Sequence, residues 1–307
     1  MLFSILKQVG IASSDCHFTN VFNIAPWPRA ELEHFTGPRA QTIPGMPAIL
    51  PNKFVRAEFE PELHRLHREL ALVSPNLIIA LGAAPCWALL EKSGIKKVRG
   101  APTLSVRGMK VLATYSPGTI FRQYKLYPIF AADLHKAATE YSFPELRRPE
   151  RFIHVEPALK DLFLFEREFI ARATYLSVDV ETANNQITCL GIAPSTDRAI
   201  VIPFTDDTKA SHNYWPDLET EVAVWDWVRR ILGSKVYRLV GQNFNYDMKF
   251  IFQSYGIPLP GATDDIMLLH HALQPELEKS LGFMGSLYTK ELSWKFMRPK
   301  HTVKKED

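Results

Sequence analysis

The hydrophobic pattern of the first half of the chain predicts an α/β domain. Leucines at helical spacing indicate an amphipathic helix over residues 62–73. The apolar run 76–82 ends in glycine, as a buried parallel strand would. A second strand-like run covers residues 110–115, whereas the proline- and glycine-rich residues 24–61 predict a long irregular loop. We therefore expect a domain over residues 1–141.

The second half of the chain begins with strands and continues with alternating strands and helices. Residues 142–151 are polar, contain prolines and have no periodic pattern, so they are predicted to be a linker. Turn residues separate three strand-like runs, which predict an antiparallel meander over 175–180, 187–192 and 199–204. Further helices and a strand are predicted over 218–232, 238–241, 245–255 and 265–273. This order matches a ribonuclease-H-like layout in a domain over residues 152–307.

Composition and charge narrow the class of protein. Hydrophobic residues make up 46% and charged residues 22%, as in soluble globular proteins, and no apolar run reaches the roughly 18 residues of a membrane helix. Cys16, Cys86 and Cys189 form no CxxC pair, so neither a disulfide framework nor a zinc site is expected, and a reducing cytoplasm fits. The net charge is +7 over residues 1–155 and −4 over residues 156–307. A basic half beside an acidic half suits a nucleic-acid binder joined to a metal site, although such a balance is also common on solvated surfaces.

Two carboxylates lie at alternate positions where the first strand of the meander ends. Asp179 and Glu181 are two residues apart on a strand, so their side chains point to the same face, where they repel each other unless a cation lies between them. Asp247 follows a second strand and falls in the first turn of the next helix. Each has an ordinary explanation alone, a solvated strand end or a favourable charge at a helix N-terminus. Three converging carboxylates, however, are what two Mg²⁺ ions about 4 Å apart need for phosphodiester hydrolysis. Mn²⁺ shares these ligands.

The sequences around these carboxylates read D-V-E-T from Asp179, V-G-Q-N-F-N-Y-D ending at Asp247, and D-D-I-M-L from Asp264. Over residues 174–290 they resemble the first two motifs and the following helix of the 3′–5′ exonuclease domain of family A DNA polymerases, in the DEDD superfamily. The resemblance implies that Asp179 and Glu181 bind the metal that activates water, that Asp179 bridges to the second metal, and that Asp247 completes the site. By the same resemblance, Thr182 and Asn243 lie near the 3′-terminal nucleotide.

The family's third motif, Tyr-x-x-x-Asp or His-x-x-x-x-Asp, supplies a fourth metal ligand and is not found in this sequence. Two H-x4-E sequences have a similar spacing, His271 with Glu276 and His301 with Glu306. A surface histidine near a helix end and a basic tail explain them better. The resemblance therefore implies three carboxylates of four, in a domain that is cut before its end. A piece of a longer or split family A polymerase, whose other part supplies the missing motif, is the simplest explanation.

Four stretches of the first half resemble the uracil-DNA glycosylase superfamily. They are F-T-N-V-F-N from Phe18, L-I-I-A-L-G from Leu77, V-R-G from Val98, and A-T-Y-S-P-G-T-I-F-R from Ala113. The resemblance implies a three-layer α/β/α domain of enzymes that flip a base into a pocket and hydrolyse its glycosidic bond. Ser116 stands where the family has the histidine that stabilises the leaving uracil, and a serine cannot carry its positive charge. The water-activating motif and the iron–sulfur cysteines are also missing, so we expect a degenerate, N-terminally truncated glycosylase-like domain.

This degenerate domain is expected either to bind DNA or to serve as a purely structural spacer, and it retains residues suited to DNA. Asn20 suits either a base contact or the cap of a turn. Arg99 and Arg122, with aromatic residues nearby, offer cations and stacking faces for single-stranded DNA, unless those aromatics belong to the core.

Three functions follow from these features. The first is a 3′–5′ exonuclease that proofreads in phage-type DNA replication, acting on single-stranded DNA or 3′ ends in a bacterial or phage-infected cell. The second is a non-catalytic DNA-binding or scaffold subunit of a split polymerase. Uracil excision is the least favoured, because of Ser116.

Overall fold

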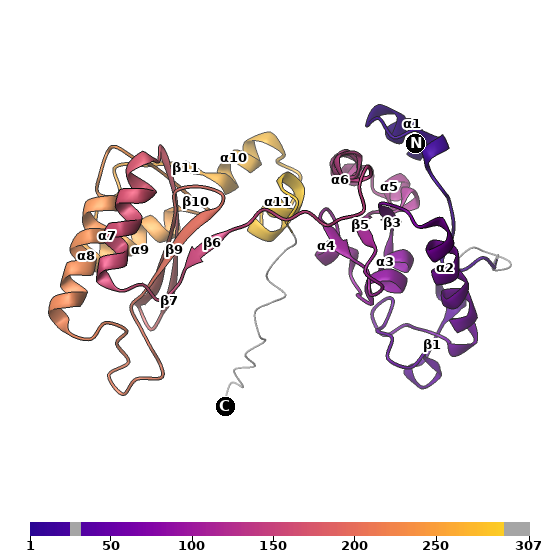
Figure 1. Ribbon diagram of the computed structural model, residues 1–307, viewed down its shortest axis with the longest axis horizontal. Coiled ribbons are helices and arrows are strands. Elements are labelled where there is room, and N and C mark those ends of the chain that lie inside the picture. The colour runs from indigo at the N-terminus through magenta and orange to yellow at the C-terminus, as the bar shows by residue number, and fades with distance from the viewer. Residues whose placement is uncertain (25–31, 292–307) are drawn as a thin grey trace. The chain divides into compact units, whose positions relative to one another are not determined.

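The computed structural model describes residues 1–24 and 32–291, and the chain divides into two compact units (Figure 1). The first unit contains Met1–Arg147 and the residues from Ser280 onward, and the second contains Arg148–Lys279. The chain passes from the first unit to the second within the predicted linker, 142–151. It returns to the first unit at Ser280, a boundary that the sequence does not predict.

The first unit is built around a three-stranded sheet of order β3–β5–β4. β5 (Lys110–Thr114) pairs in parallel with β3 (Ile78–Leu81) and antiparallel with β4 (Pro102–Leu104). All five residues of β5 are buried, as expected of a strand that is paired on both edges. Helix α2 (Glu60–Val73) contributes its leucine face to the core, and α3 (Ala83–Leu90) follows β3.

The remaining elements of the first unit are mostly short. β1 (Thr36–Gly37) and β2 (Phe54–Val55) form a two-stranded antiparallel pair in the region that the sequence predicts to be irregular. The other α-helices in the described part of this unit are α1 (Leu2–Gln8), α4 (Ile95–Val98), α5 (Pro117–Arg122), α6 (Tyr127–Glu140) and α11 (Leu281–Tyr288).

The stretch 18–23, which resembles a strand of the glycosylase superfamily, does not form a strand. Its backbone is bonded instead to side chains of α2. Arg65 donates to the carbonyl oxygens of Asn20 and Val21 at 2.6 and 3.2 Å, and Glu62 accepts from the N–H of Asn23 at 2.7 Å. Within the described residues no neighbouring strand lies beside this stretch, and without one a ladder of backbone bonds cannot form.

The second unit contains a six-stranded mixed sheet of order β11–β10–β7–β8–β9–β6. Its centre is the predicted antiparallel meander, which the structure confirms as β7 (Tyr175–Ala183), β8 (Gln186–Ala193) and β9 (Arg198–Pro203). Asn184 and Asn185 form the first turn with positive φ, the backbone that two-residue hairpin turns require. The other strands pair in parallel and are β6 (Phe152–His154), β10 (Arg238–Gly241) and β11 (Ala262–Asp265).

Four α-helices complete the second unit: α7 (Leu159–Glu168), α8 (Leu218–Leu232), α9 (Asn245–Tyr255) and α10 (Ile266–Leu273). The bounds of α8, β10 and α9 are those that the sequence predicts. Helices α7 and α8 lie side by side (Figure 1) and share Glu166, which accepts from Trp227 at 2.8 Å and pairs with Arg230. Apolar side chains of α7, α8 and α9 form one core with the sheet.

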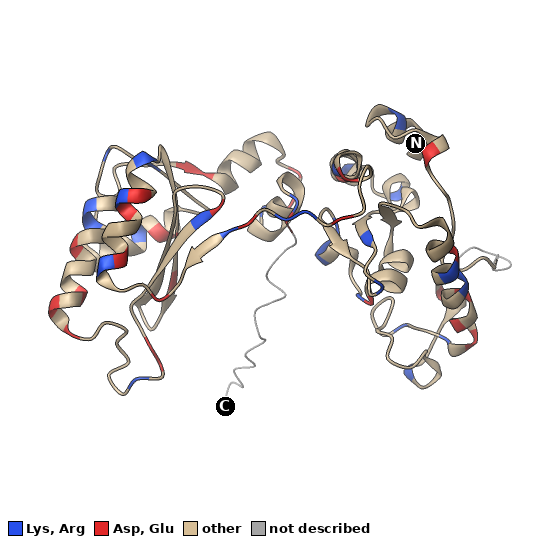
Figure 2. Ribbon diagram, in the orientation of Figure 1, with Lys and Arg blue, Asp and Glu red and all other residues tan. Residues whose placement is uncertain are grey.

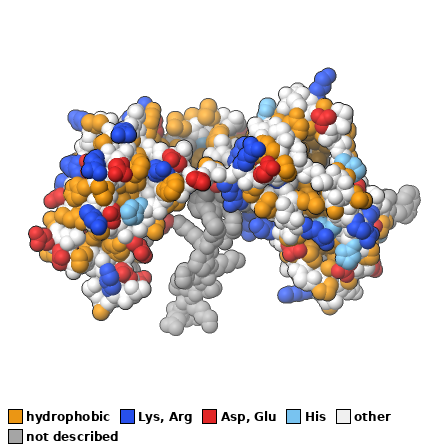
Figure 3. Space-filling view, in the orientation of Figure 1, with side chains coloured by type: hydrophobic (Ala, Val, Ile, Leu, Met, Phe, Trp, Pro, Cys, Tyr) orange, Lys and Arg blue, Asp and Glu red, His pale blue; other side chains and the backbone are white. Residues whose placement is uncertain are grey.

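The surface of each unit mixes charged and apolar side chains. Acidic and basic residues are interspersed along α2 and α8 (Figure 2). Hydrophobic side chains reach the surface between the charged ones (Figure 3), as on most globular proteins, so an exposed apolar residue alone marks no site. Among the described helices, none has the length and apolar character needed to cross a membrane.

Candidate active site

Strand β7 carries Asp179 and Glu181 on its exposed face. They alternate with buried Val178 and Val180, because successive side chains of a strand point to opposite faces. On the neighbouring strand, Asp179 lies opposite Gly191, which has no side chain to cover it. The two β7 carboxylates are therefore open to solvent.

Asp247 reaches the same strand from the first turn of α9. It is 4% exposed, and its Oδ1 accepts a hydrogen bond from the N–H of Val180 at 3.1 Å. Val180 stands between the two β7 carboxylates. β10 pairs with β7 only as far as Ser177, so beyond that point the Asp247 carboxylate replaces a strand partner on this edge. All three predicted carboxylates thus meet at one end of β7.

The electrostatics of this strand end are unfavourable to negative charge. The pKa of Asp247 is raised to about 6, first by burial and then by the neighbouring charges of Asp179 and Asp265, while the Val180 N–H acts in the opposite direction. Burial also raises the pKa of the Cys189 thiol, with contributions from Glu181 and Asp179. A cation at this strand end would relieve the repulsion between the carboxylates.

The turn between β10 and α9 is held by Asp265. Its carboxylate accepts from the N–H groups of Asn243, Phe244 and Met267 at 3.1, 2.9 and 2.8 Å. A Cβ on Gly241 would lie 2.2 Å from the Phe244 ring, so the tight turn needs glycine there. Because this turn sets where α9 begins, Asp265 helps to position Asp247. Sequence reasoning missed this role, although an Asp directly before a helix is a typical N-cap signal.

Thr182 and Asn243 lie beside the carboxylates in the chain. The Thr182 hydroxyl is 2.9 Å from the Tyr246 hydroxyl, which links the end of β7 to the first turn of α9. Asn243 is exposed and has a φ of 52°, in the left-handed region that asparagine tolerates better than most residues. Both residues therefore border the strand end that holds the carboxylates.

The donor set suits a hard divalent cation, because it consists of carboxylate oxygens. The side chains are not arranged as a finished coordination site, however. Across residues 1–24 and 32–291, no three His, Cys, Asp or Glu side chains surround a common metal position. The Asp247 Oδ1 is engaged by Val180. The carboxylates thus share one strand end but not one coordination shell.

Two known families match the two halves of the chain. Residues 159–300 match the family model of the 3′–5′ exonuclease domain of DNA polymerase A type, and residues 1–139 match that of the uracil-DNA glycosylase superfamily. The first half of the chain is thus similar to the glycosylase superfamily and the second half to 3′–5′ exonuclease domains. No curated protein sequence matches the chain.

Solved exonuclease domains align with part of the chain. The EXD2 exonuclease domain soaked in Mg is 17% identical, with a TM-score of 0.29, and the alignment covers 39% of this chain and 58% of that domain. The same domain soaked in Mn and GMP is 17% identical, with a TM-score of 0.30 and coverages of 44% and 68%. The EXO domain of Aedes aegypti Nibbler is 10% identical, with a TM-score of 0.36 and coverages of 53% and 80%.

The fourth ligand of the exonuclease domain has no candidate in the described residues. His271 and Glu276, one of the two H-x4-E pairs, are both exposed. The neighbouring His270 is the buried one, with its Nε2 at 3.1 Å from the carbonyl oxygen of Glu278. His301 and Glu306, the other pair, lie outside the described residues.

In the glycosylase-like domain, Ser116 has a structural task. It is the N-cap of α5, and its Oγ accepts from the N–H of Thr119 at 3.2 Å and lies 3.0 Å from the Thr119 hydroxyl. Asn20 is exposed, and its carbonyl oxygen is bonded to Arg65. Ser116 therefore serves as a helix cap at the position where the family has a histidine.

The expectation that Arg99 contacts DNA is wrong. Arg99 is 1% exposed. Its guanidinium donates two hydrogen bonds to the buried carboxylate of Asp133 and one to the Ser286 Oγ at 2.9 Å. Buried charges are tolerated when they are paired in this way.

Arg122, in contrast, is exposed in the last turn of α5. Phe121 and Tyr124 beside it are 74% and 71% exposed, so they are not part of the core. These three residues offer the cation and stacking faces that single-stranded DNA binds.

Proposed function

We propose that this protein is a 3′–5′ exonuclease that removes nucleotides from 3′ ends of DNA with the help of two divalent cations, Mg²⁺ or Mn²⁺. One observation carries the proposal. The Asp247 carboxylate accepts from the N–H of Val180, the residue between Asp179 and Glu181. Two distant parts of the chain thereby bring three carboxylates to one strand end. The match to the exonuclease family supports the same reaction class.

Asp179, Glu181 and Asp247 are the residues that would hold the cations. Bound there, divalent cations would lower the pKa of water and stabilise charge on the scissile phosphate. Asp247 must lose its proton to take part, and its raised pKa of about 6 makes this step sensitive to pH. Metal affinity is therefore expected to rise as the pH passes through about 6.

Thr182 and Asn243 are the proposed contacts of the 3′-terminal nucleotide. Both border the carboxylates, and the hydroxyl pair of Thr182 and Tyr246 is exposed, so it is free to exchange its partner for a sugar or phosphate oxygen. Their part in the reaction is to orient the terminal phosphodiester, which contributes to the rate by proximity.

The fourth ligand is proposed to come from a family A DNA polymerase acting with this chain. The three carboxylates of this chain are one fewer than the four ligands that the family resemblance implies, so a partner is needed to supply the other. An exonuclease that acts together with a DNA polymerase suggests proofreading in phage-type replication, in a bacterial or phage-infected cytoplasm.

A digestion assay tests the exonuclease proposal. Single-stranded DNA labelled at its 5′ end is incubated with Mg²⁺ or Mn²⁺ and the full chain, and products are resolved on a sequencing gel. We expect a ladder of shortened products, which Asp179→Ala abolishes. Asp226→Asn, an exposed carboxylate of α8, is the matched control and should digest like the wild type. An uncut substrate in both metals, both with and without a partner family A polymerase, would sink the proposal, as would equal shortening by Asp179→Ala.

A second candidate, non-catalytic DNA binding, is favoured by the exposed Phe121, Arg122 and Tyr124 of the glycosylase-like domain. It predicts affinity for single-stranded DNA in EDTA that falls steeply with salt and is unchanged in Asp179→Ala. Uracil excision has no comparable support, because the Ser116 hydroxyl caps α5. Release of uracil from a deoxyuridine oligonucleotide would restore that third function.

A further inference from the structure

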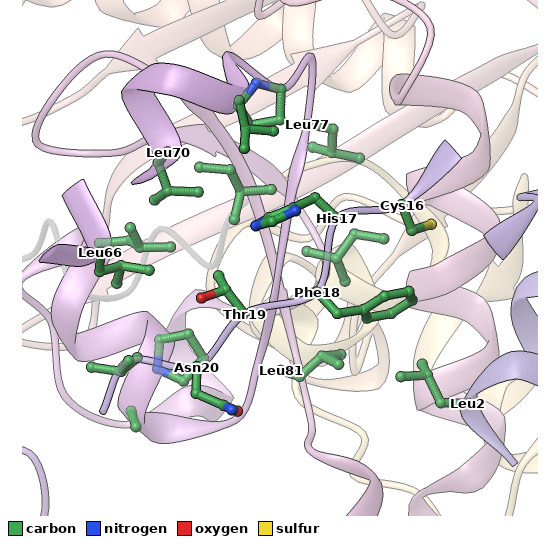
Figure 4. A pocket seen from close by; sticks show the side chains of 18 of the residues that line it. Leu2, Cys16, His17, Phe18, Thr19, Asn20, Leu66, Leu70, Leu77 and Leu81 are labelled. Carbon is green, nitrogen blue, oxygen red and sulfur yellow. The ribbon is translucent and has the colours of Figure 1, made fainter. Parts of the chain in front are cut away.

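The buried charges of the first unit gather at α6 and not in its groove. That groove, of about 960 Å³, is lined mainly by apolar side chains, among them Leu66, Leu70, Leu77 and Leu81 (Figure 4). Among the described residues no Lys or Arg lines it, so it offers no cation for the phosphates of DNA. The charges at α6 therefore suggest a role for this unit beyond binding DNA.

One face of α6 carries charged side chains that are mostly withdrawn from solvent. Asp133, Lys136 and Glu140 lie three or four positions apart and therefore share one side of the helix. Asp133 and Glu140 are 0% and 3% exposed, and burial lowers the pKa of the Lys136 ammonium to about 8. Charges that are removed from water in this way need partners in the folded state.

Two partners of this face come from the segment that contains α11. Lys136 donates to the carbonyl oxygen of Ser286 at 2.5 Å, and also to that of Gly100 at 2.9 Å. Glu140 accepts from Lys290, which follows α11, at 2.6 Å. Helix α11 is thereby fixed within the first unit at its C-terminal end.

The residue before α11 is bonded to the turn of the candidate active site. Lys279 directly precedes Ser280, the N-cap of α11, and its carbonyl oxygen accepts from the Gln242 Nε2 at 3.0 Å. The Gln242 Oε1 is buried and has no hydrogen-bond partner in the described part of the chain, so the Lys279 carbonyl orients this amide. Gln242 belongs to the turn between β10 and α9, beside Asn243, whose N–H is held by Asp265.

These contacts form a short connection between α6 and the start of α9. Each contact lies within one unit, and the peptide bond between Lys279 and Ser280 is the link between the two sets. Helix α11 has eight residues, and isolated helices shorter than about 12 residues are marginal in water. Its order therefore depends on what holds it, and the position of the adjoining Lys279 carbonyl depends on α11.

We propose that Lys136 and Glu140 of the first unit are positioning residues for the candidate exonuclease site. By holding α11 they fix the Lys279 carbonyl, which orients Gln242 and steadies the turn from which α9 presents Asp247. The glycosylase-like half of the chain thereby serves the reaction of the other half. The effect on activity rests on the proposed exonuclease function, whereas the effect on the order of the turn does not.

Amide hydrogen exchange on the full chain tests the ordering. Lys290→Met removes a cation from Glu140, which keeps Lys110 as a partner, so the fold is retained. We expect the amides of α11 to exchange at least tenfold faster, and those of Asn243 and Phe244 at least threefold faster. Lys290→Arg keeps the charge and should restore both rates.

Lys53→Met is the matched control within the first unit. Lys53 also forms an ion pair, with Glu33 at 2.8 Å, and the Lys53 and Lys290 side chains are 42% and 46% exposed. The control variant should change neither the amides of α11 nor those of the turn. The fluorescence of buried Trp87 reports that the first unit keeps its fold in every variant.

A double-mutant cycle separates the proposed connection from a general loosening of the protein. Gln242→Met keeps the length of the side chain but cannot donate to Lys279. In this background, Lys290→Met should still loosen α11 but should cause no further change at Asn243 and Phe244. The proposal is overturned if Lys290→Met loosens α11 and leaves both turn amides unchanged, or if it affects them equally with and without Gln242.

Lys136→Met is a second variant, which removes the bonds to the carbonyl oxygens of Ser286 and Gly100. It should also loosen α11 and the turn. If α11 stays protected in both Lys136→Met and Lys290→Met, the charged side chains of α6 do not hold it and the proposal is wrong.

Digestion kinetics show whether the ordering matters for the reaction. In Lys290→Met, kcat on single-stranded DNA labelled at its 5′ end should fall at least threefold with KM within twofold, because Asp247 is misplaced while the DNA contacts remain. Faster exchange in the turn with an unchanged kcat would refute the positioning role. If the wild type digests no DNA under any condition, the exonuclease function fails, and the exchange experiments still decide whether α6 orders the turn.

Discussion

The buried carboxylate of Asp247 leads to a prediction that separates stability from activity. Asp247→Asn removes the negative charge but keeps a side-chain oxygen that can accept from the Val180 N–H. We expect the variant to be more stable than the wild type at pH 7 and to have lost exonuclease activity. Functional sites often show this trade-off, because a charge that the reaction needs is costly in the folded state.

The size of the effect follows from the pKa of Asp247. Its value of about 6 in the folded chain, against an ordinary 3.8, corresponds to about 3 kcal/mol. The folded state binds this proton more tightly than the unfolded state does. The free energy of unfolding should therefore fall as the pH rises from about 4 to about 6, and stay lower above that. Asparagine has no proton to lose, so the variant should not show this decrease.

Local stability of the second unit is the quantity to measure, because two compact units need not unfold together. Amide hydrogen exchange in α9 and β7 gives the free energy of opening at several pH values between 4 and 7. We expect Asp247→Asn to match the wild type near pH 4 and to exceed it by up to about 3 kcal/mol at pH 7. Mg²⁺ should reduce the difference in opening free energy between the two proteins at pH 7, because it stabilises the wild type, which binds it, more than the variant.

Asp226→Asn is the control for a change of charge without burial. It should leave the pH dependence of the second unit unchanged. A variant Asp247→Asn that is less stable than the wild type at pH 7 would refute the reasoning, because the carboxylate would then be favoured in the folded state. If the free energy of unfolding of Asp247→Asn still decreased between pH 4 and pH 6, another titrating group would be its cause.

Three further predictions concern residues outside the carboxylate set. Asp265→Ala should lower kcat/KM of the exonuclease at least tenfold and destabilise the second unit by about 1–3 kcal/mol, because three N–H groups lose their common acceptor. Asp264→Ala removes only an ion pair nearer the surface and should leave digestion within twofold of the wild type. Arg99→Ala should lower the free energy of unfolding in urea by about 3–5 kcal/mol, because it leaves the buried carboxylate of Asp133 without its ion-pair partner, and it should leave DNA affinity unchanged. Weaker DNA binding by a variant of full stability would contradict the burial of Arg99. In fluorescence anisotropy with single-stranded DNA, Arg122→Ala should reduce the slope of log affinity against log salt by about 0.7, and Phe121→Ala should cost about 1–3 kcal/mol; an unchanged affinity in both would exclude this surface.

The elements predicted correctly from the sequence are those whose pattern is local. Helix α8 and strand β10 have continuous apolar periodicity, and the structure gives them the predicted bounds. β11 was missed because its sequence, A-T-D-D, contains no apolar run; it forms on the backbone of β10. α6 was missed because its buried face includes Asp133 and Glu140. Those charges are buried against partners far away in sequence, which periodicity cannot show.

The candidate site divides in the same way. Asp179, Glu181 and Asp247 could be named from short motifs, since strand period and helix start place them from a few neighbouring residues. Asp265 could not, because its role depends on N–H groups from a turn more than twenty positions earlier in the chain.

The V-R-G turn shows how a correct resemblance can suggest the wrong role. The resemblance places Arg99 and Gly100 in a DNA-binding domain, where an arginine suggests a phosphate contact. In the structure, Arg99 donates to the Ser286 hydroxyl, and a Cβ on Gly100 would lie 2.5 Å from the Ser286 carbonyl oxygen. Lys136 donates to that same carbonyl. The turn therefore packs against α11. This helix lies within the residues that match the exonuclease family model, but it belongs to the first compact unit. Because both the arginine and the glycine are needed for this packing, the turn would be retained even in a glycosylase-like domain that had lost its chemistry.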